Sequence, residues 1–136
     1  MPFETSVAVR FGDVDHAGIL FYPRYYIYLH DCFENFFNES SVGYVDLVDR
    51  RRIGFPTVHL ESDHKAPMRW GDTLDVTMTV PRLGERSATF HYLGRRHRDG
   101  VVAIDAKITI ACVDMDTFKA LSFPADLRAL FGSIAS

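Results

Sequence analysis

Apolar side chains recur at two different periods along this chain, and each period predicts its own kind of element. Residues 3–9 alternate apolar with polar or small positions, which predicts an opening strand. From Tyr22 to Phe37 the large apolar residues return every three or four positions, which predicts a long helix. Pro23 suits the first turn of such a helix, because no hydrogen bond within the helix is lost there. The stripe consists of Tyr22, Tyr25, Tyr26, Leu29, Phe33, Phe36 and Phe37.

Beyond Phe55 the apolar period falls to two, which is typical of strands with one buried face. The longest alternating run covers residues 102–112, and we expect it to form a central strand. Asp99-Gly100 is the clearest hairpin signal, and Pro124 opens a short terminal helix. The expected strands cover residues 57–65, 74–80, 87–92, 102–112 and 119–123, with turns at 81–85 and 114–116.

One long early helix followed by consecutive antiparallel strands predicts an α+β fold. Between the two parts, residues 40–52 show no regular period, apart from a short helical turn expected at 44–48. A single helix cannot cover a broad curved sheet completely, so strand edges and apolar margins stay open. We therefore expect the chain to dimerise through a sheet edge.

The composition fits one domain that spans residues 1–136, because 47% of its residues are hydrophobic and 13% are aromatic. No apolar run approaches the roughly 20 residues that cross a bilayer, and the first ten residues lack the pattern of a secretory signal. Cys32 and Cys112 show no metal-ligand or redox-pair spacing, so we expect reduced, packed thiols. These features predict a cytoplasmic protein that does not bind membranes.

A formal net charge of -3 gives no electrostatic reason to expect nucleic acid as a partner. The single basic cluster, residues 95–98, stands directly before the Asp99-Gly100 turn. It is either a solvated hairpin tip or a phosphate contact, for which arginine is well suited. The six histidines form no ligand cluster by spacing, so we expect no metal site.

The candidate chemistry lies where the loop at Asp13 and Asp15 runs into the long helix. A helix start leaves backbone N–H groups near residues 20–22 without partners, at the positive end of the helix dipole. Such donors can hold a developing oxyanion, and Asp15 lies within plausible reach of the same atom. The alternative is that both aspartates only satisfy loop N–H groups. From the spacing alone, both readings stay open for the two aspartates.

Residues 13–25, with the sequence DVDHAGILFYPRY, resemble the signature of the 4-hydroxybenzoyl-CoA thioesterase family. Residues 66–74 are similar to the proline and Gly-Asp turn of the same family, and the resemblance extends over nearly the whole chain. Pro23 resembles the 4-hydroxybenzoyl-CoA enzyme itself, because the other large branch of the family tends to carry histidine there. The resemblance implies a hotdog fold, in which a curved antiparallel sheet of about five strands wraps a long central helix.

The resemblance also implies hydrolysis of an acyl-CoA thioester in a site shared between two subunits. Asp15 matches the family's essential aspartate, a nucleophile or a general base, and the backbone N–H of Tyr22 matches its carbonyl-polarising group. With this match we take Asp15 as the catalytic candidate and leave Asp13 a structural role. The positions that match its CoA-binding residues are Arg86, Ser87 and Lys119. The implied assembly is a homodimer paired into a homotetramer, and the implied reaction needs no cofactor, since CoA is part of the substrate.

Two positions of the implied acyl pocket differ from the 4-hydroxybenzoyl enzyme. His30 stands at the position of an acidic residue, and Phe55 stands at the position of a small hydroxyl residue. A buried phenol needs a polar partner, so this pocket should hold 4-hydroxybenzoyl poorly. We expect another aryl group or a short to medium acyl chain instead.

Two other functions are compatible with a hotdog chain. A dehydratase acting on 3-hydroxyacyl thioesters usually needs a histidine with a carboxylate in the pocket, and no matching motif is present. A non-catalytic acyl-CoA-binding module needs the same cavity without chemistry at Asp15. An enoyl product would identify the first, and tight binding without thiol release would identify the second.

Overall fold

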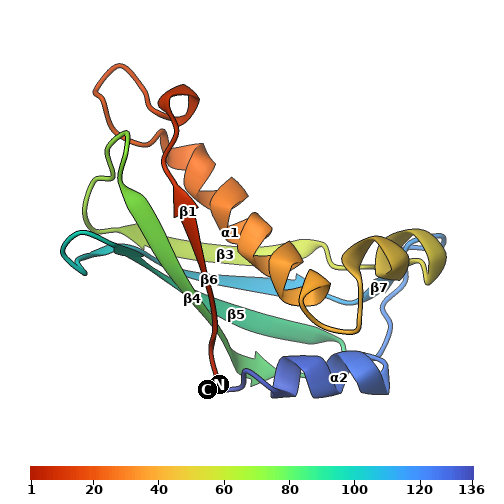
Figure 1. Ribbon diagram of the computed structural model, residues 1–136. Helices are drawn as coiled ribbons and strands as arrows, with labels where there is room; N and C mark the ends of the chain where they lie inside the picture. The colour runs from red at the N-terminus through yellow and green to blue at the C-terminus, as the bar shows by residue number, and fades with distance from the viewer.

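Five strands form one antiparallel sheet, and a long helix lies across one face of it (Figure 1). The structure is a computed structural model that describes residues 1–136. The strand order is β1-β4-β5-β6-β3, so the α+β class and the five-stranded antiparallel sheet predicted from the sequence are confirmed. The sheet contains β1 (Phe3–Ala8), β3 (Thr57–His64), β4 (Thr73–Leu83), β5 (Ser87–Arg96) and β6 (Val102–Ala111), and the helices are α1 (Tyr22–Asn38) and α2 (Ala125–Gly132).

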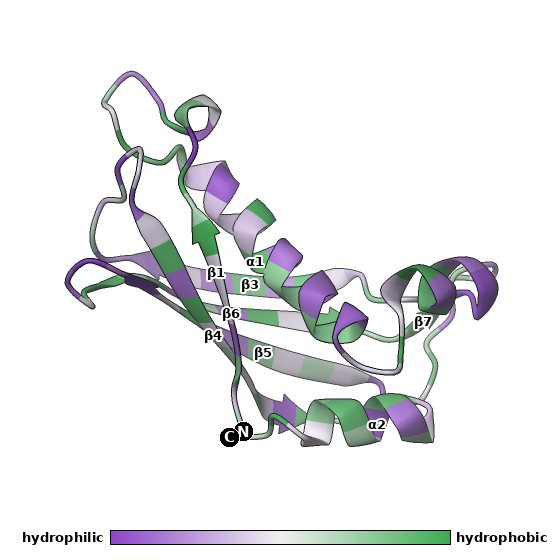
Figure 2. Cartoon of the chain, in the orientation of Figure 1, coloured by the Kyte–Doolittle hydropathy of each residue, from purple (hydrophilic) through white to green (hydrophobic).

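Helix α1 forms because its apolar stripe has a sheet face on which to pack. Leu29 and Phe37 are completely buried there, and each buried side chain of this size stabilises the fold by about 1.5–3 kcal/mol. Figure 2 shows the hydrophobic positions alternating with hydrophilic ones along the strands beneath the helix. No side chain caps the start of α1, where Phe21 is the residue before the first turn. The first N–H groups of the helix are therefore left to other partners.

Strand β4 is longer than the sequence predicted. We expected a turn at 81–85, but the strand continues through Pro81 to Leu83, so the turn starts later than predicted. The pairing of β4 with β5 shifts register between Thr79 and Arg82, which indicates a bulge at this point. A proline fits there because it has no N–H to give to the ladder.

The predicted strand at 119–123 is wrong. Residues 119–123 make only an isolated bridge between Ala120 and Val113, which lies in β7 (Val113–Asp114). Strand β7 pairs instead with β2 (Ile53–Gly54), a short strand that no periodicity indicated. Phe123 turns into the core, where its N–H bonds the carbonyl of Glu85 rather than a neighbouring strand.

Strand β6 lies inside the sheet, between β5 and β3, as its long alternating run predicted. Strand β3 is at the edge, and seven of its eight residues are exposed. A π-helical turn at Asp46–Arg50 overlaps the helical turn expected at 44–48. Cys32 and Cys112 are both free and buried, and burial raises the pKa of the Cys32 thiol to about 12. Neither helix combines the length and the apolar character that crossing a bilayer requires.

Candidate active site

The loop that carries Asp15 is a tight turn held by its own backbone. The Asp15 N–H donates to the Ile19 carbonyl at 2.9 Å, and the Asp15 carbonyl accepts from the Gly18 N–H at 2.9 Å. Gly18 has a φ of 78°, a conformation that glycine adopts without strain. The Asp15 side chain is half-buried, and its Oδ1 accepts a hydrogen bond from the Ala17 N–H at 2.8 Å. Its Oδ2 has no hydrogen-bond partner in the chain, so one carboxylate oxygen is free.

The start of α1 leaves one backbone donor without an acceptor. The N–H of Leu20 bonds the Met68 carbonyl at 2.8 Å, and that of Phe21 bonds the Asp13 carbonyl at 2.9 Å. Neighbouring loops therefore use two of the three N–H groups that we expected to be free. The Tyr22 N–H makes no hydrogen bond within the chain and lies at the positive end of the α1 dipole.

A cavity of about 290 Å³ opens beside this donor, and we call it the helix-start pocket. Its walls come from the loop before α1, from the first turn of α1, and from the segment after β3. Asp15 does not line this pocket, but Ile19, whose carbonyl accepts the Asp15 N–H, does. The lining residues are Ile19, Leu20, Tyr22, Tyr25, His64, Lys65, Ala66 and Pro67.

A second cavity of about 150 Å³ lies further along α1, and we call it the aromatic pocket. It brings together His30 and Phe55, the two residues that the sequence assigned to the acyl group. Phe55 stacks on Phe37 with ring centroids 5.7 Å apart, and the His30 ring lies 3.7 Å from the Glu34 carboxylate. The lining residues are Tyr26, His30, Phe33, Tyr44, Phe55, Thr57, Leu60, Tyr92, Ile108 and Ile110.

Three side chains that sequence reasoning missed lie between the two pockets. The Tyr26 hydroxyl is 2.7 Å from the Ser62 Oγ and 3.0 Å from the His64 Nε2, and we call this group the Tyr26–Ser62–His64 cluster. Tyr26 lines the aromatic pocket, and His64 lines the helix-start pocket. No local pattern signals this cluster, because its members come from α1 and β3, 36 and 38 residues apart in the chain.

The Asp13 carboxylate contacts side chains of α1, not the loop N–H groups that we expected it to satisfy. It accepts a hydrogen bond from the Tyr28 hydroxyl at 2.5 Å and lies 3.5 Å from the Arg24 Nε. Burial, together with this carboxylate, raises the pKa of Tyr28 above its usual range. The Asp13 carbonyl also accepts the Phe21 N–H, so Asp13 fastens the loop to the first two turns of α1.

Arginines of the basic cluster at 95–98 bond neighbouring carboxylates and a backbone carbonyl of the same chain. The Arg96 guanidinium bonds the Asp99 carboxylate and, at 2.8 Å, the Pro67 carbonyl. Arg98 donates to the Asp72 carboxylate at 2.9 Å. These contacts fit a hairpin tip that supports the loop beside the helix-start pocket.

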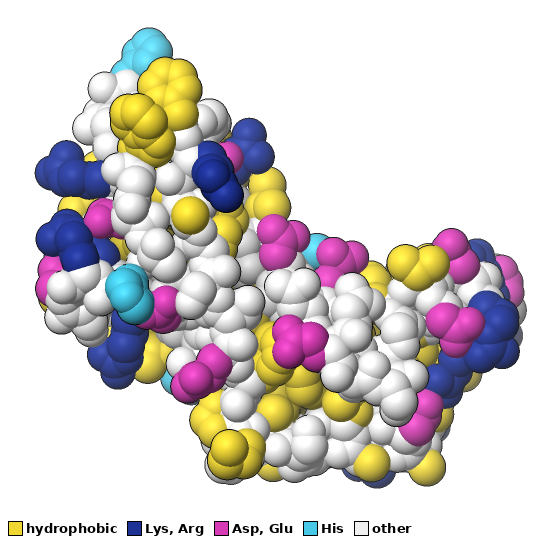
Figure 3. All heavy atoms as spheres, viewed as in Figure 1, with side chains coloured by type: hydrophobic (Ala, Val, Ile, Leu, Met, Phe, Trp, Pro, Cys, Tyr) yellow, Lys and Arg dark blue, Asp and Glu magenta, His cyan; other side chains and the backbone are white.

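The end of the molecule that holds the helix-start pocket also exposes aromatic side chains. Phe11 and Trp70 are 71% and 64% exposed, and their rings meet edge to face with centroids 5.3 Å apart. Figure 3 shows hydrophobic side chains gathered at the top of this view, over the loops that precede α1. Exposed apolar surface therefore lies on the loops at this end of the molecule.

The candidate CoA-binding residues lie at the opposite end of the sheet. Ser87 begins β5, whereas His64 of the helix-start pocket lies level with Gly94, seven residues and about 23 Å along this strand. The Cys112 N–H bonds the carbonyl of Arg86 at 2.9 Å, and that of Leu121 bonds the carbonyl of Cys112, which brings the segment of Lys119 close to Arg86. Within one chain these residues do not meet Asp15.

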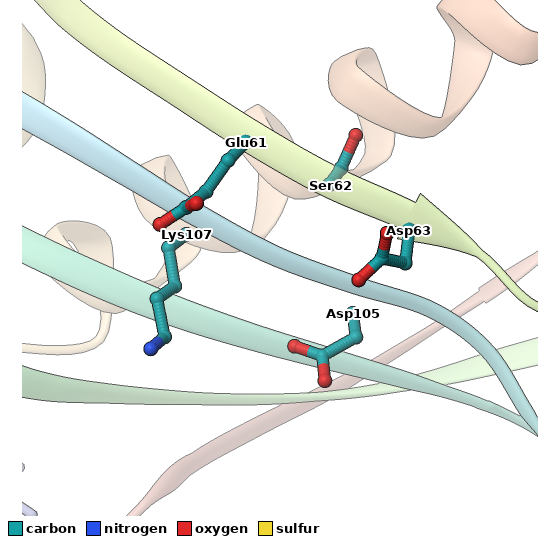
Figure 4. A pocket seen from close by; sticks show the side chains of 5 residues that line it. All are labelled: Glu61, Ser62, Asp63, Asp105 and Lys107. Carbon is teal, nitrogen blue, oxygen red and sulfur yellow. The ribbon is translucent and has the colours of Figure 1, made fainter.

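A further hollow of about 240 Å³ lies over β3 and β6 on the sheet face away from α1. Figure 4 shows Asp63, Asp105 and Lys107 directed to this side, whereas Ser62 points to the opposite side of β3. All of its lining residues are polar or charged, and it has no connection to the loop of Asp15. We do not assign it to the active site.

A five-stranded antiparallel sheet with one long helix packed across its face is the arrangement that the hotdog resemblance implies. Residues 9–131 match the family described as "Thioesterase-like superfamily", and the chain belongs to this family. This match confirms the predicted family and the hotdog fold. It also confirms the predicted class of enzyme, a thioester hydrolase.

Relatives with names agree with this assignment. The acyl-CoA thioesterase YbgC of Haemophilus influenzae is 23% identical over 95% of this chain and 93% of that protein. A 1,4-dihydroxy-2-naphthoyl-CoA hydrolase of Nostoc punctiforme is 30% identical over 62% of this chain and 57% of that protein. A solved thioesterase superfamily structure from Jannaschia sp. CCS1 has a TM-score of 0.90 and 28% identity, covering 99% of this chain and 94% of that one.

Proposed function

We propose that this protein hydrolyses acyl-CoA thioesters, with Asp15 and the Tyr22 N–H acting on the thioester carbonyl. One observation carries the proposal: the Tyr22 N–H has no acceptor, lies at the positive start of α1 and borders the helix-start pocket beside the Asp15 loop. A donor held in this way can stabilise negative charge on the carbonyl oxygen as the carbonyl carbon is attacked. The names of the relatives, which include acyl-CoA thioesterases and CoA hydrolases, support the substrate class.

Two routes are open to Asp15. Its free Oδ2 attacks the carbonyl carbon, the C–S bond breaks to release CoA thiolate, and water then hydrolyses the acyl-aspartate anhydride. Alternatively, the carboxylate takes a proton from a water molecule that attacks the carbonyl carbon directly; the C–S bond then breaks, and the proton passes to the CoA thiolate. Both routes consume one water and give a free acid and CoA. Thiolate is a good leaving group, so the proposed reaction uses no metal and no cofactor beyond the CoA of the substrate.

The aromatic pocket supports an aryl group or a short to medium acyl chain as the acyl part. An apolar cavity of about 150 Å³ is large enough for benzene in another protein, and the aromatic pocket has this volume. His30 and Phe55 form part of its wall and are the proposed acyl-binding residues. Phe55 offers no hydrogen-bond partner, which disfavours a hydroxyl beside its ring.

The proposed CoA-binding residues support a site built from two copies of the chain. Arg86, Ser87 and Lys119 lie at the far end of the sheet, with Ser87 about 23 Å from the helix-start pocket of its own chain, so they would serve the pocket of a second copy. The Arg86 and Lys119 side chains make no hydrogen bonds within the chain, which leaves both cations available for phosphate.

Strand β3 supplies an edge for this assembly. Its Thr57 end lies across the sheet near Ser87, and its His64 end lies at the helix-start pocket. A two-fold axis at the free edge would pair β3 antiparallel with itself and bring Thr57 of the partner subunit beside His64. The end of the sheet that carries Arg86, Ser87 and Lys119 in one chain would then face the helix-start pocket of the other chain. Val58 and Leu60, 61% and 42% exposed, lie on this edge strand, where pairing would cover apolar surface.

The proposal includes a homodimer of this kind that pairs further into a homotetramer. Acyl-CoA is the proposed ligand, and the net charge of -3 does not favour nucleic acid. Two free buried thiols fit a reducing compartment, so we propose the cytoplasm as the location.

The test is a screen of the wild-type protein against aryl-CoA, straight-chain acyl-CoA and acyl carrier protein thioesters. Thiol release and the identity of the acyl product are measured for each compound. We expect free acid and CoA from at least one acyl-CoA. An enoyl product would support the dehydratase, and tight binding without thiol release would support the non-catalytic module; either result would contradict the proposal.

A further inference from the structure

Two aromatic side chains separate the aromatic pocket from a further apolar cavity, and we call this pair the Tyr44–Phe55 wall. Both residues line the aromatic pocket and also a cavity of about 270 Å³, which we call the outer hollow. The outer hollow lies where α1 ends, beside the π-helical turn and β7 (Figure 1). An opening in the wall would therefore join the two cavities. The residues that line the outer hollow are Tyr44, Val48, Gly54, Phe55, Pro56, Met115 and Phe118.

The two rings of the wall are held differently. Phe55 is enclosed by other phenylalanine rings, those of Phe33, Phe37, Phe123 and Phe131. The half-buried Tyr44 belongs to the short connection after α1, and its hydroxyl makes no hydrogen bond within the chain. Its ring meets those of His30, Phe33 and Phe37, at centroid distances between 5.4 and 6.1 Å, but not that of Phe55. Tyr44 is therefore the half of the wall that a smaller side chain can open while Phe55 stays in place.

The sides of the outer hollow are fixed by the pairing of β2 with β7. A Cβ at Gly54 would overlap the sulfur of Met115, so the Met115 side chain lies directly on the β2 backbone. The Met115 N–H donates to the Arg52 carbonyl at 2.9 Å, and the Phe118 N–H donates to the Asp114 carbonyl at 2.7 Å. Phe118 has a φ of 60°, a left-handed conformation that a bulky residue keeps only where its surroundings hold it. Its side chain is nevertheless 65% exposed, so a ligand in the hollow would cover apolar surface.

We propose that Tyr44 sets the upper limit on the length of the acyl chain, because its ring closes the aromatic pocket against the outer hollow. The inference rests on the proposed function, which places the acyl part in the aromatic pocket. No charged residue lines the outer hollow, and the Tyr44 hydroxyl is the only side-chain oxygen or nitrogen among its lining residues. Such a cavity fits the end of an unbranched alkyl chain. In wild type the chain stops at the wall, and without the Tyr44 ring it continues into the outer hollow toward Met115 and Phe118.

The experiment measures thiol release from a series of saturated straight-chain acyl-CoAs, from butanoyl-CoA to tetradecanoyl-CoA, by wild type and by Tyr44→Ala. The limit is the chain length beyond which kcat/KM no longer rises. We expect Tyr44→Ala to move this limit up by about two carbons or more, with kcat/KM rising about fourfold for each methylene that leaves water, or about fifteenfold for two. The Kd of each compound, measured by calorimetry in Asp15→Asn with and without Tyr44→Ala, should show the same shift.

Further variants test whether the chain enters the outer hollow. Tyr44→Phe keeps the ring and should keep the wild-type limit. Val48 lines the outer hollow but not the aromatic pocket, so Val48→Phe added to Tyr44→Ala should fill the hollow and return the limit to its wild-type value. Tyr44→Leu opens the wall with a smaller loss of packing and repeats the test if Tyr44→Ala does not fold.

Three results would overturn the proposal. They are a wild-type limit in the folded variant with alanine or leucine at this position, a raised limit in Tyr44→Phe, and a raised limit that Val48→Phe leaves unchanged. A limit that shifts in Kd while no compound releases thiol would keep the assignment of Tyr44 and overturn the hydrolase instead.

Discussion

Replacing Tyr22 with proline should remove the proposed carbonyl donor while the fold is kept. Tyr22 is the first residue of α1, a position that proline favours, and its N–H makes no hydrogen bond that the fold would lose. The preceding residue, Phe21, has φ -65° and ψ 126°, which is the extended conformation that a following proline requires. The backbone at this point therefore needs no rearrangement.

The expected loss follows from the function of a single oxyanion donor. Removing one such donor costs about 10²–10³ in kcat, or roughly 3–4 kcal/mol. The Tyr22 side chain is 64% exposed, so Tyr22→Ala removes the ring but keeps the N–H. We expect Tyr22→Pro to be slower than Tyr22→Ala by this factor, with little difference in KM.

The assay is steady-state thiol release by the two variants, with thermal unfolding measured on the same samples. Similar unfolding midpoints would show that the proline is tolerated. If Tyr22→Pro is as stable as Tyr22→Ala and also equals it in kcat, the Tyr22 N–H does not polarise the carbonyl. The start of α1 would then have no part in stabilising the oxyanion.

Two further changes test the assembly and the surface electrostatics. Val58→Asp puts a charge on the exposed edge strand β3 and should prevent the two copies from pairing there. We expect monomers in analytical ultracentrifugation and loss of thiol release in dilute solution. An unchanged dimer would rule out pairing through this edge. The hydrogen bond from Arg51 lowers the pKa of Asp126. Its stabilising effect is complete above the ordinary carboxyl pKa and is lost as the pH falls through the lowered value. Asp126→Asn should therefore lower the unfolding midpoint at pH 7 but not at pH 2, and an equal change at both would contradict this ion pair.

Periodicity predicted most of the fold because each long element buries one face. The stripe from Tyr22 to Phe37 and the alternation in residues 102–112 correspond to α1 and β6, where propensity and burial agree. The errors arose where tertiary contacts override local pattern. The bulge that carries β4 through Pro81 depends on β5, and Phe123 leaves its expected strand to enter the core.

The candidate site could be predicted only in part. The loop and helix start were indicated by local features, and His30 and Phe55 by resemblance; the structure places the latter two in one pocket. The sequence did not show which N–H stays free, because carbonyls from distant loops satisfy Leu20 and Phe21. The Tyr26–Ser62–His64 cluster was missed because its hydrogen bonds join α1 to β3.

Thiol release by Asp15→Asn is the deciding measurement for the proposed hydrolase. Asparagine keeps an Oδ1 that accepts the Ala17 N–H, so the loop should persist while the nucleophile or base is lost. Asp63→Asn, on the far face of the sheet, is the matched control and should keep full activity. We predict that Asp15→Asn still binds acyl-CoA but releases thiol at least about a hundredfold more slowly than wild type. Wild-type turnover in a folded Asp15→Asn protein would contradict the account.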